Sequence, residues 1–165
     1  MSWHRFDLQT ICTGNICRSP MAAIVLAAQF AEAGLADQVA VSSSGVSSEE
    51  AGNGIDRRAA QALTRRGYEV DARHRAHRIT SGEIAAADLL LPQAYGHYLA
   101  LERRGATADQ LRMMRQFDPA FANREPSYDL DIDDPWYGGP ADFEIALDSI
   151  EAAAPGVVKY VGGLL

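Results

Sequence analysis

Apolar stretches alternate with short polar, glycine-containing segments along this chain. Residues 6–11 form a short, half-polar run typical of a strand, and residues 20–33 are nearly all apolar and rich in helix formers. Gly34 is placed to end that helix, and residues 39–44 alternate between apolar and polar positions like a second strand. The first part of the chain therefore predicts a strand, a helix and a strand in that order.

The same alternation continues toward the C-terminus. Residues 87–91 are interpreted as a buried strand that Pro92 stops, and residues 111–117 as a further strand. Three more helices are expected, at residues 56–63, 95–103 and 142–153. Asp56 is placed to cap the first of these helices. Strands that alternate with helices form a parallel sheet with helices on both faces, so the expected fold class is α/β.

The length and composition favour one packed domain. A chain of 165 residues with 47% hydrophobic content builds one sizeable core, so we expect residues 1–165 to form a single domain. No apolar stretch has the length of a membrane span, and no signal-peptide core precedes the first strand, which favours a cytoplasmic location. The formal net charge of −7 disfavours nucleic acid and anionic membranes as partners.

The cysteines and histidines predict no metal site. The two cysteines, Cys12 and Cys17, lie five positions apart, which argues against a disulfide framework. Together with the weak His-x-x-His of His74 and His77, they fall short of a zinc ligand set, and no cofactor is expected. The most positive segment, residues 73–78, is interpreted as a solvated loop, with contact to an acidic partner as the alternative.

The segment between the first strand and the first helix carries the most specific chemistry. Its sequence, CTGNICRS, forms a strand-to-helix turn in which successive N–H groups can point inward beside the positive end of a helix dipole. Gly14 gives the turn backbone freedom, and Pro20 lies at the helix start, where its missing N–H is harmless. The turn is therefore a candidate cradle for a phosphate-like anion, at the sheet edge where α/β folds bind ligands.

Cys12 and Arg18 lie at the two ends of this turn. N–H donors, a helix N-terminus and a guanidinium all favour the ionised thiol, so Cys12 is expected to act as a thiolate nucleophile. The planar fork of Arg18 suits two oxygens of a phosphoryl group. Ser19 either donates its hydroxyl to Cys12 or caps the helix. The alternative is a buried structural cysteine, a helix cap and a surface arginine, and the strand–loop–helix context favours the site.

Residues 12–20 resemble the signature C-x-G-N-x-C-R-S-P of the low-molecular-weight protein tyrosine phosphatases. The resemblance extends over nearly the whole chain and includes weaker matches and the segment DDPWYG at residues 133–138, similar to the family's D-P-Y-Y-G. It implies a four-stranded parallel sheet flanked by helices, with the phosphate-binding loop after the first strand. It also implies a loop whose remaining residues bind phosphate, namely Thr13, Gly14, Asn15, Ile16, Cys17 and Ser19.

The resemblance further assigns the residues around the loop. Asp133 and Asp134 cannot be distinguished by spacing, but the family's acid directly precedes proline, which selects Asp134 as proton donor and later base. Trp136 and Tyr137 would wall the entrance, and Ser43, with Asn15, would hold the loop in shape. Cys17 would form a reversible disulfide with oxidised Cys12, or else is a packing residue.

The implied reaction is hydrolysis of phosphotyrosine or a small aryl phosphate through a cysteinyl-phosphate, releasing inorganic phosphate without a metal. Two departures affect substrate preference: Glu49 replaces an aromatic residue of the second loop, and Pro92-Gln93 replaces the family's Met-Asp. Ile16 favours tyrosine over arginine as the dephosphorylated residue. The alternatives are an arsenate reductase that uses an external thiol, and a non-catalytic module that binds a phosphoprotein.

Overall fold

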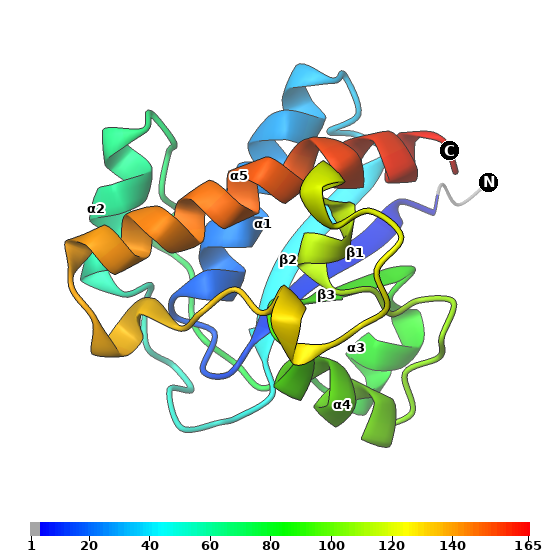
Figure 1. The fold of residues 1–165 in the computed structure, drawn as a ribbon, viewed down its shortest axis with the longest axis horizontal. Helices are drawn as coiled ribbons and strands as arrows, with labels where there is room; N and C mark the ends of the chain where they lie inside the picture. The colour runs from blue at the N-terminus through cyan, green and yellow to red at the C-terminus, as the bar shows by residue number, and fades with distance from the viewer. Residues whose placement is uncertain (1–3) are drawn as a thin grey trace.

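A computed structural model describes residues 4–165; the first three residues, on which part of the signal-peptide prediction rests, lie outside this range. At its centre lies a parallel sheet with the strand order β2-β1-β3. The strands are β1 (Phe6–Cys12), β2 (Val39–Gly45) and β3 (Leu89–Pro92). Figure 1 shows this sheet with helix α5 (Pro140–Gly162), in orange to red, near the C-terminal end of the chain.

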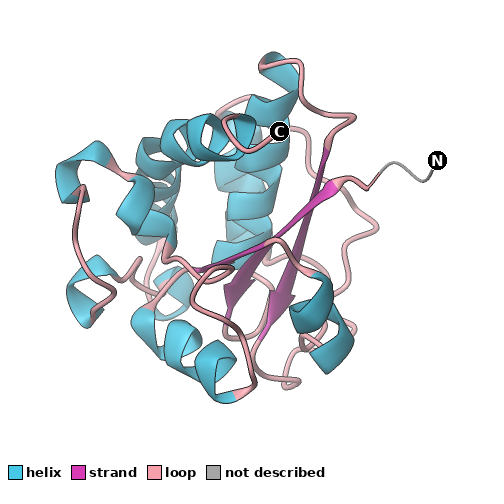
Figure 2. Ribbon diagram, turned by 90° about the vertical axis from the view of Figure 1, so that its right-hand side faces the viewer, coloured by secondary structure: helices cyan, strands magenta, loops and turns pink. Residues whose placement is uncertain are grey.

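Helices cover the two faces of the sheet, as the sequence predicts (Figure 2). On one face, Leu8, Leu89 and Leu91 pack in a cluster built largely by α1 (Arg18–Glu32), α2 (Arg57–Arg65) and α5. On the other face, Ile11 and Leu90 pack with residues of α3 (Ser81–Ala86) and α4 (Tyr95–Arg103). Successive strand residues point to opposite faces, so adjacent residues of β3 belong to different clusters.

The prediction of a fourth strand at residues 111–117 is wrong. Leu111 forms only an isolated parallel bridge with Leu90, made by hydrogen bonds from Leu90 N to Gln110 O (2.7 Å) and from Arg112 N to Leu90 O (3.2 Å). Two residues further along β3, the next backbone N–H on this edge would belong to residue 92. That residue is Pro92, which has no N–H to continue the ladder. The chain instead turns into a 3-10 helix, Met114–Phe117.

Helix boundaries follow local capping. Asp56 accepts hydrogen bonds from Arg58 N and Ala59 N at the start of α2, as predicted. The short helix α3 was not predicted; its six residues are held by a capping box between Thr80 and Glu83. Helix α5 is longer than predicted and continues past Pro155, because its buried face extends to residues near the C-terminus.

This architecture places the loop between β1 and α1 at the carboxyl end of the central strand. β1 ends at Cys12 and α1 begins at Arg18, so both ends of the loop are anchored in regular structure. Three 3-10 turns in the second half of the chain, Pro119–Phe121, Tyr128–Leu130 and Pro135–Tyr137, carry the chain back toward the loop. Across the described helices, none has the length and apolar character needed to cross a bilayer.

Candidate active site

The loop after β1 lines a hollow of about 320 Å³. Its walls come from three segments far apart in the sequence: residues 12–18, the pair Glu49 and Glu50, and residues 134–137. Thr13, Gly14 and Ile16 line it together with Cys12 and Arg18, whereas the side chains of Asn15 and Ser19 lie fully buried behind the loop. Tertiary structure therefore collects most of the predicted site residues in one place.

The backbone amides of the loop point to anion binding. Among residues 4–165, none accepts a hydrogen bond from the N–H groups of residues 13–17. Buried N–H groups without a partner are costly, so a loop that leaves several of them unpaired is suited to an acceptor from outside the chain. The N-terminus of α1 adds its dipole in the same place, which favours a negatively charged acceptor.

Cys12 lies at the end of β1 with its side chain buried, and Cys12 Sγ is 3.0 Å from Ser19 Oγ. Ser19 Oγ is also 3.1 Å from Ser44 O, to which it donates. The serine hydroxyl carries a single proton, so donation to a Cys12 thiolate requires that it turn away from the Ser44 carbonyl. Both roles predicted for Ser19 involve the start of α1, but the side chain contacts Cys12 rather than capping the helix.

Arg18 is the most buried cation near the hollow, with only 7% of its side chain exposed. Nη1 donates to Ile132 O at 2.8 Å, and Nη2 lies 3.5 Å from Asp134 Oδ2. Within the described chain, Arg18 Nε has no hydrogen-bond partner. Nη1 is thus fixed to a backbone carbonyl and Nη2 lies within ion-pair distance of Asp134, while Nε is unpaired in the described structure; the Nε–Nη2 edge has the geometry for a bidentate contact.

The second wall carries the acid predicted to complete the site. Asp134 lines the hollow, and Asp134 Oδ1 accepts a hydrogen bond from Trp136 N at 3.1 Å. Asp133 does not line the hollow and is exposed. The rings of Trp136 and Tyr137 are 5.0 Å apart in a T-shaped pair, and the two residues are 43% and 88% exposed. They therefore lie at the entrance, available to a substrate.

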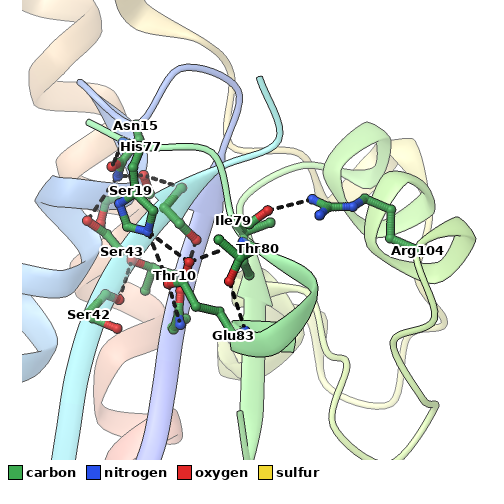
Figure 3. A network of polar contacts seen from close by, with 12 residues as sticks. Thr10, Asn15, Ser19, Ser42, Ser43, His77, Ile79, Thr80, Glu83 and Arg104 are labelled. Carbon is green, nitrogen blue, oxygen red and sulfur yellow. Dashed lines mark hydrogen bonds and ion pairs between the residues drawn. The ribbon is translucent and has the colours of Figure 1, made fainter. Parts of the chain in front are cut away.

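Asn15 holds the loop from behind (Figure 3). Asn15 Nδ2 donates to Ser19 Oγ and to Ser43 Oγ, both at 2.9 Å. Asn15 Oδ1 accepts from His77 N at 3.1 Å, and the backbone has φ of 62°, a left-handed conformation that Asn tolerates better than most residues. Ser43 thus lies beneath the loop, hydrogen-bonded to Asn15.

The basic segment at residues 73–78 does more than form a solvated loop. His74 Nε2 lies 2.8 Å from Asn15 O, and His77 O accepts a hydrogen bond from Gly45 N at 2.9 Å. Arg73 and Arg75 are exposed, as predicted for a solvated segment. His77 is itself exposed and supports the loop through its backbone, whereas His74 is half-buried and does so through its side chain.

Gly45, at the end of β2, also supports the loop, and the sequence offered no physical reason to expect this. A Cβ atom there would lie 2.5 Å from Thr13 O and 3.2 Å from Asn15 N. The end of β2 therefore approaches the loop more closely than any side chain permits.

Cys17 is 4% exposed and packs in the main core cluster. Burial raises the pKa of its thiol far above the ordinary value, and the nearby Asp56 carboxylate acts in the same direction. Cys17 is therefore a neutral thiol, unsuited to nucleophilic attack. Both cysteines are free in this structure.

His97 is a further buried group near the loop that sequence reasoning missed. It lies in the first turn of α4 with 6% exposure, and His97 Nε2 is 2.9 Å from Thr13 Oγ1. Burial, together with the positive charge of Arg18, lowers the pKa of His97 to about 3. The imidazole is consequently neutral throughout the range in which a cysteine thiolate operates.

The lowered pKa of His97 predicts an acid-dependent loss of stability. Below pH 6.5, the ordinary pKa of histidine, His97 is protonated in the unfolded chain, whereas in the folded protein it stays neutral down to about pH 3. The free energy of unfolding therefore falls as pH decreases through that range. Between about pH 7 and about pH 4.5 the wild type should lose roughly 2–3 kcal/mol more than His97→Gln. Urea unfolding of both proteins at the two pH values measures this difference, and parallel losses would contradict it.

No group of three or more His, Cys, Asp or Glu side chains in residues 4–165 is arranged to hold a metal ion. The groups at the hollow are a thiol, a guanidinium, a carboxyl group and the unpaired amides of the loop.

Comparisons with known proteins agree with this geometry. The family model described as low molecular weight phosphotyrosine protein phosphatase matches residues 7–162. Low molecular weight protein-tyrosine phosphatase A of Mycobacterium tuberculosis is 42% identical over 151 residues, covering 92% of this chain and 88% of that protein. The corresponding Sus scrofa phosphatase is 32% identical over 134 residues, covering 81% of this chain and 82% of its own length.

Solved structures lead to the same family. A protein tyrosine phosphatase from Entamoeba histolytica, with Hepes in its active site, superposes with a TM-score of 0.84 at 26% identity, covering 97% of this chain and 99% of that one. The resemblance found in the loop sequence is thereby confirmed over almost the whole length. The chain belongs to the low molecular weight phosphotyrosine protein phosphatase family.

Proposed function

We propose that this protein hydrolyses phosphotyrosine in proteins, or small aryl phosphates, through a cysteinyl-phosphate intermediate. One observation carries the proposal: Cys12, the Arg18 guanidinium, the unpaired amides of residues 13–17 and the Asp134 carboxyl meet at one hollow. A nucleophile, a set of oxyanion donors and a proton donor are the three components that phosphate monoester hydrolysis by a thiolate requires.

In the first step, the Cys12 thiolate attacks phosphorus and the bond from phosphorus to the phenolic oxygen breaks. The unpaired loop amides and the Nε–Nη2 edge of Arg18 hold the non-bridging oxygens while charge moves toward the leaving group. Asp134, in its protonated form, donates its proton to the departing phenolate. The products of this step are tyrosine and a phosphorylated Cys12.

In the second step, a water molecule attacks the phosphorus of cysteinyl-phosphate and the S–P bond breaks. Asp134, now ionised, takes a proton from that water and returns to its starting form. Ser19 Oγ, 3.0 Å from Cys12 Sγ, is placed to donate to the thiolate as it leaves. Inorganic phosphate is released and no other reactant is consumed.

Asp134→Ala tests this assignment through its dependence on the leaving group. Because kcat/KM reports the first chemical step, it should fall about 10³-fold for phenyl phosphate, whose leaving group needs the proton. For 4-nitrophenyl phosphate, whose leaving group departs without one, the loss should be only about 10-fold. The matched control is Asp133→Ala, which removes the adjacent exposed carboxyl; equal losses for the two variants would contradict the assignment.

The same preparations separate the rival functions. A phosphatase that forms the intermediate carries a phosphoryl group on the Cys12 peptide after acid quenching during turnover, detected by mass spectrometry. An arsenate reductase instead releases arsenite only when an external thiol is added and hydrolyses aryl phosphate negligibly. A non-catalytic module binds a phosphotyrosine peptide without turnover, and Cys12→Ser leaves that binding intact.

Glu49 and Glu50 give the entrance a negative wall, which we propose selects against acidic peptides. Glu49→Lys should raise kcat/KM for a phosphotyrosine peptide with flanking aspartates by about 5- to 10-fold at low salt, because repulsion becomes attraction. A peptide with flanking lysines should show the opposite change, and 4-nitrophenyl phosphate a much smaller one. Unchanged preference between the two peptides would remove Glu49 from substrate selection.

A further inference from the structure

The side chain of Thr13 connects the hollow to a buried histidine of α4. Thr13 directly follows Cys12 and lines the hollow, and Thr13 Oγ1 is 2.9 Å from His97 Nε2. Within residues 4–165 this is the only hydrogen-bond partner of the Thr13 hydroxyl. The two residues are 84 positions apart, so the contact is a product of the tertiary fold.

The backbone at the start of α4 determines which nitrogen of His97 carries the proton. Ala94 N donates a hydrogen bond to His97 Nδ1 at 3.2 Å, so Nδ1 is the unprotonated acceptor. A neutral imidazole then carries its proton on Nε2 and donates it to Thr13 Oγ1. Burial and the nearby Arg18 charge keep the ring neutral and preserve this tautomer.

This arrangement constrains the proton of Thr13. A hydroxyl that accepts a hydrogen bond still has one proton to donate, and His97 cannot receive it. We propose that His97 is a positioning residue that holds Thr13 Oγ1 as an acceptor and directs the Thr13 hydroxyl proton into the hollow, where it donates to an oxygen of bound phosphate. The proposal rests on the proposed function only in requiring that the loop binds phosphate.

Such a donor adds to the site without adding charge. Arg18 already places a buried cation beside the hollow, and a protonated His97 would lose the hydrogen bond from Ala94 N. A neutral imidazole that positions a hydroxyl avoids both costs, since the hydroxyl donates to a charged oxygen and carries no charge of its own. The side chain of Thr13 thereby joins the loop amides as a phosphate donor.

Direct binding of inorganic phosphate, measured by calorimetry, tests the proposal without requiring turnover. Thr13→Val, which is isosteric and lacks the hydroxyl, should bind phosphate about 10-fold more weakly, and Thr13→Ser should recover most of that loss. His97→Leu should weaken binding to a similar extent. The double variant should bind no more weakly than either single one, because both remove the same donor.

A loss in the double variant equal to the product of the single losses would overturn the proposal, as would Thr13→Val binding within about twofold of wild type. His97→Leu also removes the contact between His97 and Ala94 N at the start of α4, so a control for lost helix capping is needed. Thr80→Ala removes the capping box of α3, away from the hollow, and should lower Tm without weakening phosphate binding. If His97→Leu does not fold, nitrogen NMR of the wild-type imidazole decides, since a proton on Nδ1 would also overturn the proposal.

Failure of the proposed function gives a different result from failure of this inference. A wild type that binds phosphate and shows the Thr13→Val loss, yet hydrolyses no aryl phosphate, would retain the inference and reject the phosphatase. A wild type that hydrolyses aryl phosphates, together with a Thr13→Val variant of unchanged phosphate affinity, would retain the phosphatase and reject the inference.

Discussion

Cys12→Ser is expected to lower kcat for an aryl phosphate by on the order of 10⁴-fold or more. A serine hydroxyl is not ionised near neutral pH, and among the described residues the side-chain hydrogen-bond partner of Cys12 Sγ is Ser19 Oγ, a hydroxyl that cannot act as a base. The assay is steady-state release of phosphate from 4-nitrophenyl phosphate. A rate equal to that of wild type would refute the thiolate mechanism.

The same variant should keep its affinity for inorganic phosphate. The amides of residues 13–17 and the Arg18 guanidinium remain, and replacing a thiolate by a neutral hydroxyl removes a negative charge that faces the anion. Calorimetry with phosphate provides the control for folding. Simultaneous loss of phosphate binding and turnover would mean that the substitution had disrupted the loop. The lower kcat would then not identify Cys12 as the nucleophile.

Arg18→Lys is expected to lower kcat/KM by about 10³-fold, even though the charge is retained. The guanidinium reaches Ile132 O with Nη1 while its other edge faces the hollow, and one ammonium group cannot make both contacts in that geometry. Because the position is almost fully buried, water replaces the missing donor poorly. Both kcat and phosphate affinity should fall, since the contact strengthens as charge develops on the transferring group.

Arg112→Lys is the matched control for that substitution. Arg112 also donates to backbone carbonyls, those of Ala108 and Leu111, but it lies outside the hollow. Its kinetics should stay within about twofold of wild type, as expected for a half-buried residue that does not line the hollow. An Arg18→Lys variant that performs as well as this control would show that positive charge alone, without a planar fork, suffices at the loop.

Much of the fold was predictable because its signals are local. Local patterns of apolar and polar residues predicted β1, β2, β3, α1, α2, α4 and the first half of α5, and the Asp56 cap predicted the start of α2. The fourth strand failed because periodicity at residues 111–117 says nothing about the neighbouring strand. That strand ends in Pro92, which offers no N–H for a further ladder hydrogen bond.

The support of the loop was less predictable than the loop itself. Asn15 and Ser43 entered through the resemblance to a family, whereas His74 and His77 were interpreted as part of a solvated basic segment and His97 was not singled out. A lone histidine has the same local pattern whether it is solvated or buried, and the basic residues around His74 and His77 favoured solvation. Only the partners of His74 and His77, and the burial of His97, distinguish them.

The order of residues by itself determined the cysteine loop, its place between a strand and a helix, and the family to which it belongs. Those features depend on residues that are close together in the sequence, so their spacing and side-chain chemistry can be read from it. Tertiary structure decided what surrounds the loop: Arg18 meets Ile132 across 114 positions, Thr13 meets His97 across 84, and Asn15 meets His74 across 59. Such contacts follow from how the sheet and helices pack, so no local pattern encodes them.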